Sequence, residues 1–245
     1  MWALLLAVAT AATPDQAVEQ YLSGDYAASA RSGQELVNEG LVNADIYYNL
    51  GNALFRRDDV AGAILAWRRA ELLAPRDGDI DANLAHARLS TLDRIDRDQP
   101  SSGALFWRES LSPVEQCWGA AFFVGLLGVL GLVRRRQPDA NVAIGALLCA
   151  VPAALLTIST LAELRDLSDS PDGVVQVQRV EVRSAGSGGV VLFELHAGAE
   201  VELRERVADQ VQVALPDGRR GWVAADAVGV VDPWAPWPAH ADESG

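Results

Sequence analysis

Three patterns of apolar and polar positions follow one another along the chain. Between positions 44 and 75 apolar residues recur at three- and four-residue spacing, which predicts amphipathic helices. Two apolar runs follow, 114–133 and 142–161, each about as long as a helix that crosses a bilayer. Beyond position 173 apolar and polar residues alternate, which is typical of short β-strands. The sequence therefore predicts three parts that differ in fold class.

The helical pattern repeats with a period of 34 residues. Its marks are Tyr47, Leu50, Gly51, Leu54, Ala63, Trp67, Ala70 and Pro75. A shift of 34 positions predicts a weaker repeat over 14–43 and one closing helix over 78–92. Small residues at Gly51 and Ala63 are expected where two helices cross. We therefore expect five helices in a short right-handed array.

This repeat resembles the tetratricopeptide family, whose arrays bind peptides or proteins in a groove lined by the first helix of each repeat. The resemblance implies that the groove residues are Tyr48, Asn49, Asn52, Phe55 and Arg56. Asn52 occupies the position with which some members hold a peptide backbone or carboxylate. The lysines that complete a carboxylate clamp are absent, and solvation of Asn49 and Asn52 is an equally good interpretation.

The two apolar runs flank a loop, 134–141, that contains Arg134, Arg135 and Arg136. Cytoplasmic loops retain arginine, so both flanking parts are expected on the outer side of a bacterial inner membrane. A glycine at every third position from Gly125 to Gly131 is expected to pack against the second run. Apart from Glu115 at the edge, neither run contains an ionisable residue, which favours an anchor over a transport path.

The alternating region predicts five short strands in a small closed barrel, with a strand pair over 175–182 and a hairpin turn at Pro216-Asp217-Gly218. Its motifs are Val182-Arg183-Ser184, Leu195–Val201 and Gly221-Trp222-Val223. They resemble the bacterial SH3 family over 173–231. The resemblance implies binding of cell-wall peptides or proteins, with Trp222 as a candidate ligand contact. Packing of Trp222 on the barrel is the alternative.

The remaining segments connect or end these parts. Residues 1–12 resemble a secretory signal, with a hydrophobic capping helix as the alternative. The tail is expected to be extended on a surface or at the lipid interface, or to be disordered. The predicted divisions are 1–12, 13–92, 93–113, 114–133, 134–141, 142–161, 162–172, 173–231 and 232–245.

Charge and candidate chemistry narrow the function classes. Of the net charge of −13, residues 1–115 contribute −7, residues 134–141 contribute +2 and residues after 161 contribute −8. Two acidic parts make nucleic acid a poor partner. Cys117 and Cys149 both lie in the apolar runs, where small apolar side chains fill space.

No residue pattern indicates catalysis. The three histidines, His86, His196 and His240, lie in different regions, and no nucleophile-and-base pair, metal-ligand spacing or phosphate loop is present. The alternating carboxylates from Asp77 to Asp81 are interpreted as a solvated turn rather than a calcium loop. We expect a protein that is not an enzyme and that holds no metal or cofactor.

The order of these parts resembles BatE-type proteins of bacterial aerotolerance operons. The resemblance is carried best by Gly51-Asn52-Ala53, Arg68-Arg69-Ala70 and Asp81-Ala82-Asn83-Leu84. Relatives are encoded beside von Willebrand A-domain membrane proteins and a MoxR-type ATPase. The resemblance implies a membrane-anchored scaffold or adaptor in an envelope complex. The alternative is a cell-wall tether or sensor that binds peptidoglycan through the SH3-like part.

Overall fold

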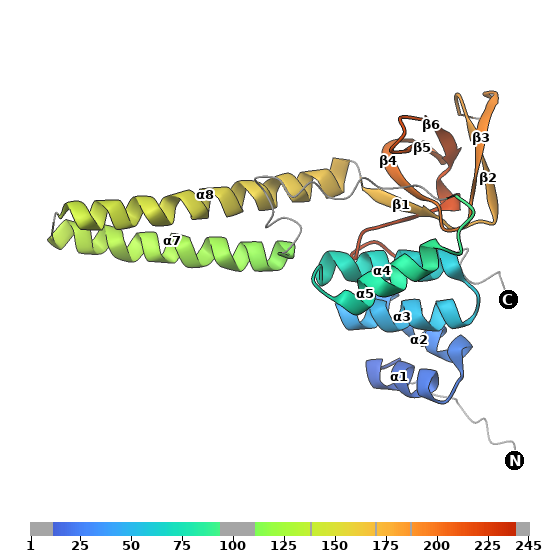
Figure 1. Cartoon of the computed structure of the whole chain (residues 1–245), viewed down its shortest axis with the longest axis horizontal. Helices are drawn as coiled ribbons and strands as arrows, with labels where there is room; N and C mark the ends of the chain where they lie inside the picture. The colour runs from blue at the N-terminus through green and yellow to red at the C-terminus, as the bar shows by residue number, and fades with distance from the viewer. Residues whose placement is uncertain (1–11, 94–110, 138, 170, 187, 239–245) are drawn as a thin grey trace, which may run out of the picture.

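The protein is described here from a computed structural model that covers residues 12–93, 111–137, 139–169, 171–186 and 188–238. The signal-like segment up to Ala11 and most of the predicted linker 93–113 lie outside the described residues. Figure 1 shows a stack of short helices, a pair of long helices and an antiparallel sheet. The coarse prediction, helices first and an all-β part last with two apolar helices between them, is confirmed.

Five short helices form the stack, and each packs against the next along the chain. They are α1 (Pro14–Leu22), α2 (Tyr26–Asn38), α3 (Ala44–Arg56), α4 (Val60–Leu73) and α5 (Gly78–Arg88). Five helices were predicted here. Arg57-Asp58-Asp59 connects α3 to α4, and α4 ends two residues before Pro75.

The 34-residue period is visible in the helix caps. Asp25 and Asp59 precede α2 and α4, and each side chain accepts a hydrogen bond from the backbone N–H three residues later, at 3.0 and 2.9 Å. The residue before each cap has a positive φ, 86° at Gly24 and 63° at Asp58. The same left-handed turn is thus made once by glycine and once by aspartate, which tolerates it better than most residues.

The core of the stack confirms the expected close approach of two helices. A Cβ atom on Gly51 would lie 2.6 Å from Nε1 of Trp67, so α3 and α4 meet where only glycine fits. Leu54 and Ile64 are fully buried beside this crossing. Each buried side chain of this size stabilises the fold by roughly 1.5–3 kcal/mol.

The long helices are α7 (Pro113–Arg136) and α8 (Ala140–Asp169). Both are long and apolar enough to cross a bilayer, and few of their side chains are buried within the protein. Ser112 and Glu115 form a reciprocal capping box at the start of α7. Pro152 lies inside α8 without ending it.

Two predictions about the long helices need correction. The arginines Arg134–Arg136 form the last turn of α7, so the connection is only residues 137–139, because cations favour a helix C-terminus. The glycines Gly125, Gly128 and Gly131 do not pack on α8: a Cβ at any of them would meet no atom within 4 Å. The contacts between α7 and α8 instead include Gly119 beside Leu156.

The sheet has seven strands in the order β3-β2-β6-β5-β4-β1-β7 and is not closed. The strands are β1 (Asp172–Val175), β2 (Arg179–Arg183), β3 (Val191–His196), β4 (Glu200–Val207), β5 (Gln210–Ala214), β6 (Arg220–Ala224) and β7 (Val228–Val230). The predicted closed five-stranded barrel is wrong in closure and in strand number.

The barrel prediction failed because the strands pair in a different order from the one expected. β1 and β2 were expected to pair with each other, but β1 lies between β4 and β7, whereas β2 lies between β3 and β6. The β5–β6 hairpin is as predicted, with Gly218 at φ 86° in its turn.

The crossing at Gly51 gives a first prediction. Gly51→Ala should lower the free energy of unfolding by about 1–3 kcal/mol, because the new methyl group overlaps the Trp67 indole. Thermal unfolding of the detergent-solubilised protein, followed by circular dichroism, measures this. The control is Gly78→Ala, whose Cβ has no neighbour within 4 Å. Equal stability of the two variants would contradict the prediction.

Candidate functional site

The five residues predicted to line a groove all lie on α3, and their side chains interact with neighbouring helices. The Asn52 side chain accepts a hydrogen bond from Asn83 of α5 at 3.1 Å. Phe55 packs its ring against Trp67 of α4 and His86 of α5, each with a centroid distance of 5.6 Å. Side chains on this side of α3 therefore contact side chains of α5.

The other three predicted residues extend this surface toward α1 and α2. The Arg56 guanidinium lies 4.4 Å from the centre of the Tyr26 ring of α2. Asn49 borders a small hollow beside Pro14 of α1, and Tyr48 is half-buried against the helical core. We call the surface of Tyr48, Asn49, Asn52, Phe55, Arg56, Asn83 and His86 the open face.

The open face repeats with the same period as the sequence. Asn83 follows Asn49 by 34 residues, and His86 follows Asn52 by 34 residues. Matching positions on α3 and α5 therefore carry amides at Asn49 and Asn83, and an amide and an imidazole at Asn52 and His86. Partly exposed amides can donate to and accept from a peptide backbone without selecting its charge.

The remaining predicted site residues stay apart from the open face. Trp222 lies on β6 opposite Arg183 and Gln212, half-buried, on the other side of the strand from the buried Gly221 and Val223. Arg134, Arg135 and Arg136 lie at the far end of α7, away from the stack. The structure therefore does not bring the open face, Trp222 and the three arginines into one site.

The sequence did not predict how the C-terminal segment binds the helices. Arg69 of α4 is fully buried and its guanidinium donates to backbone carbonyls at the end of the sheet and in the tail. These bonds are to Val230 O at 2.9 and 3.2 Å, Ala235 O at 3.0 Å and Pro236 O at 3.3 Å. The Tyr47 hydroxyl donates to Pro233 O, and the side-chain oxygen of Asn38 accepts from the Trp237 backbone N–H at 3.0 Å.

Burial governs the electrostatics of this contact, which we call the tail clamp (Asn38, Tyr47, Arg69 and residues 230–237). Burial lowers the pKa of Arg69, and burial raises the pKa of Tyr47. The arginine stays charged at neutral pH because its ordinary pKa lies far above 7. Its charge is compensated by carbonyl oxygens and by the ring of Trp237, 5.4 Å away.

A second arginine ties the sheet to the stack through ion pairs. Arg68 bonds to Glu71, to Asp172 of β1 at 2.6 Å, and approaches Glu200 of β4 at 3.2 Å. Burial disfavours the charged form, but these three carboxylates outweigh it and raise the Arg68 pKa. Arg88 of α5 also pairs with Glu200, at 2.6 Å.

Two glycines of the sheet region allow the stack to approach closely. A Cβ on Gly229 would lie 2.5 Å from Leu65 of α4, and one on Gly198 would lie 2.7 Å from the Thr91 side chain. Val174, Val231 and Trp237 belong to the same buried apolar cluster as the helices. The sheet and the five helices are thus packed as one unit, not merely tethered within reach of each other.

A local signal for the tail clamp is present in the sequence. Arg68-Arg69 interrupts the apolar helix VAGAILAWRRAELL, and two consecutive arginines in such a helix need buried partners. The tail supplies carbonyl acceptors in Pro-Trp-Ala-Pro-Trp-Pro, where proline removes competing N–H donors. The sequence of α4 does not indicate that the tail will bind its arginines, and the sequence of the tail does not indicate that it will bind α4.

Metal chemistry has no support among the described residues. No group of three His, Cys, Asp or Glu side chains there is placed to hold a metal ion. The Asp77 carboxylate caps α5, accepting from the backbone N–H groups of Asp79 and Ile80. His196 lies beside Asp93, with 3.2 Å between Nδ1 and Oδ2.

Comparison with protein-family models, curated proteins and solved structures found no match to this chain.

The tail clamp yields a second prediction. Arg69→Ala should lower the free energy of unfolding by about 2–4 kcal/mol, because buried carbonyls lose charged donors. Amide hydrogen exchange should rise most at 228–237. In the control, Arg179→Ala, a side chain that is 60% exposed and paired with Glu194 is removed, which should change stability by under about 1 kcal/mol. Unchanged exchange at 228–237 in Arg69→Ala would contradict the role of the clamp.

Proposed function

We propose that this protein is a non-catalytic, membrane-anchored scaffold that binds extended segments of partner proteins across the open face. In this proposal α1–α5 are a tetratricopeptide-like array, the sheet is an SH3-like module, and α7 and α8 are a transmembrane hairpin. The tetratricopeptide pattern of Tyr47 to Pro75 and the BatE-type order of parts support this proposal.

One observation carries the proposal: one side of the helical stack binds the chain's own tail, and another side does not. Tyr47 and Arg69 hold the chain's own tail, whereas the neighbouring Tyr48 and Asn52 belong to the open face, whose interactions are with other helices. Tail and sheet therefore stabilise the array from one side and leave half-buried amides and aromatics on the other. Aromatic and amide side chains of this kind are suited to holding a peptide.

The charge of the molecule limits the partners further. The chain is acidic overall, at −13, yet Arg56 lies exposed on the open face at the end of α3. A partner segment with neutral or basic flanks and an acidic residue facing Arg56 fits this distribution. We propose von Willebrand A-domain membrane proteins as the partner class, on the BatE-type resemblance alone.

The open face gives the third prediction. Asn52→Ala combined with Arg56→Glu should reduce partner recovery at least tenfold in affinity capture of the full-length protein from native membranes. This corresponds to a loss of about 1.4 kcal/mol or more of binding free energy. Arg31→Glu, the same charge reversal at an exposed position on α2, is the control and should leave recovery unchanged. Equal recovery by both variants would exclude the open face.

The alternative function, a cell-wall tether, rests on the half-exposed Trp222 on the outer side of β6. Sedimentation of the full-length protein with purified peptidoglycan distinguishes the two proposals. Sedimentation that Trp222→Ala abolishes and Asn52→Ala leaves intact would favour the tether over the scaffold.

The arginine-rich end of α7 provides the fourth prediction. We propose that 134–139 faces the cytoplasm of a bacterial inner membrane, with the helical stack and the sheet on the outer side. A reporter that is active only in the cytoplasm should give no signal when fused after Gly245, and a strong signal when inserted at Asp139. Reversal of the two signals would overturn this topology.

A further inference from the structure

A cavity of about 380 Å³ lies where the helical stack meets the first long helix. Three distant parts of the chain form it: the segment around the start of α3 with the end of α4, the first turn of α7, and the tail. Among the described residues, the apolar ones that line it are Val42, Ala44, Leu72, Leu73, Val114, Pro233 and Trp234. The volume is within the range of about 300–1,000 Å³ that is usual for small-ligand pockets.

The polar groups at this cavity are already engaged in local hydrogen bonds. The Asn43 side-chain oxygen accepts from the Asp45 backbone N–H at 2.7 Å. Ser112 and Glu115 cap each other at the start of α7, and Glu115 also pairs with Arg76 of the stack. The wall therefore favours an apolar occupant, because a polar one would gain little to offset its desolvation.

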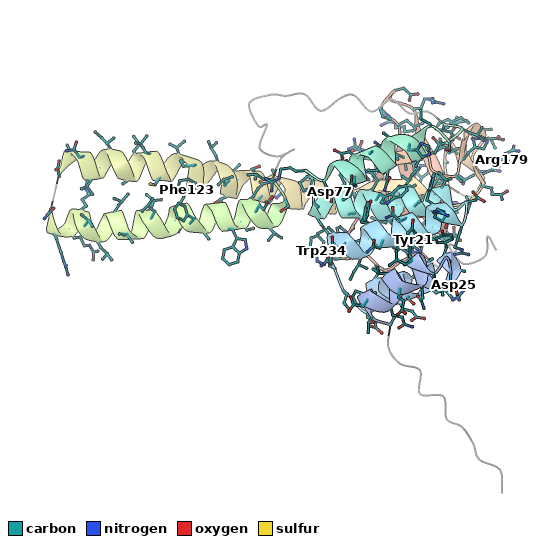
Figure 2. The ribbon with its side chains drawn as sticks, turned by 60° about the horizontal axis from the view of Figure 1, so that its bottom comes forward. Tyr21, Asp25, Asp77, Phe123, Arg179 and Trp234 are labelled. Carbon is teal, nitrogen blue, oxygen red and sulfur yellow. The ribbon has the colours of Figure 1, made fainter. Side chains whose placement is uncertain are left out.

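The position of the cavity indicates where such an occupant comes from. The first apolar span begins at Val114, a residue of the cavity wall that is 54% exposed. Figure 2 shows Trp234 at the junction between the stack and the long helices. Trp234 is 58% exposed and Trp118, one turn into α7, is 74% exposed. Tryptophan is enriched where a protein crosses from lipid to water.

We infer that this cavity binds one acyl chain of a phospholipid from the leaflet in which α7 begins. This inference rests on the proposed insertion of α7 and α8 into a bilayer. The headgroup is zwitterionic, because Glu115 lies at the cavity, Arg76 is paired with it and the surrounding chain is acidic. A free fatty acid would place its carboxylate near Glu115, which is unfavourable.

The fifth prediction tests this inference with the full-length protein in phosphatidylcholine vesicles. Phosphatidylcholine with a photoactivatable group near the end of one acyl chain should crosslink to peptides containing Leu72, Leu73 and Trp234. It should also crosslink to Phe122, a 66%-exposed residue of α7. Leu73→Trp should fill the cavity and reduce crosslinks to the Trp234 peptide at least fivefold, with Phe122 labelling unchanged.

Controls separate the inference from the function on which it rests. Leu89→Trp, at a 65%-exposed position of the stack outside the cavity wall, should leave both sets of crosslinks unchanged. Labelling of Phe122 without any at the cavity, or cavity labelling that Leu73→Trp leaves intact, would overturn the inference alone. Absence of labelling at Phe122 would overturn the proposed membrane anchor. Stronger cavity labelling by a photoactivatable fatty acid, or by phosphatidylglycerol, would contradict the assigned lipid class.

Val42→Trp serves as a second cavity-filling variant in case Leu73→Trp does not fold, which circular dichroism reports. It should produce the same selective loss at the Trp234 peptide, because Val42 lines the same cavity as Trp234.

Discussion

The buried guanidinium of Arg69 is the interaction on which the arrangement of the helical stack, the sheet and the tail depends. A charged group removed from water must have its donors satisfied, and here carbonyls of residues 230, 235 and 236 accept from it. Those carbonyls follow Arg69 by more than 160 residues, across both long helices and the sheet. The chain end is thereby brought back to α4, and β7 and β1 lie against the same helix. Arg68 adds carboxylates of β1 and β4, so two adjacent side chains of α4 bind three strands of the sheet.

This arrangement changes how an array of only five helices is stabilised. A short helical array has exposed apolar faces at its ends and on its sides, and needs neighbours to cover them. Val174, Val231 and Trp237 supply that cover from the C-terminal part. On the other side of the array, Asn52 is bonded to Asn83, and the Phe55 ring lies between those of Trp67 and His86. Rigid placement of such groups lowers the entropy lost when a peptide binds.

The same tail also forms part of the junction between the helical stack and α7. Pro233 and Trp234 lie in the chain between the carbonyls held by Arg69 and line the cavity beside the first turn of α7. There Arg76 and Glu115 link the stack to the long helix. The bound tail therefore supplies part of the wall of the cavity that we propose for an acyl chain. A change at the clamp is expected to alter both the position of the sheet and the shape of this cavity, because the tail contacts both.

Local features of this chain were predictable from sequence because their causes are local. The caps at Asp25 and Asp59, the glycine at the α3–α4 crossing and the Pro-Asp-Gly hairpin each depend on neighbours within a few residues or one repeat. The length and apolarity of α7 and α8 are likewise properties of single segments.

The tertiary structure decided which elements meet. β1 pairs with β4 and β7 in an open sheet, and Gly125 makes no close contact with α8. Arg69 takes its partners from the tail. Backbone carbonyls occur at every residue, so no sequence pattern marks the ones that a buried arginine will find, and only the folded chain brings them together.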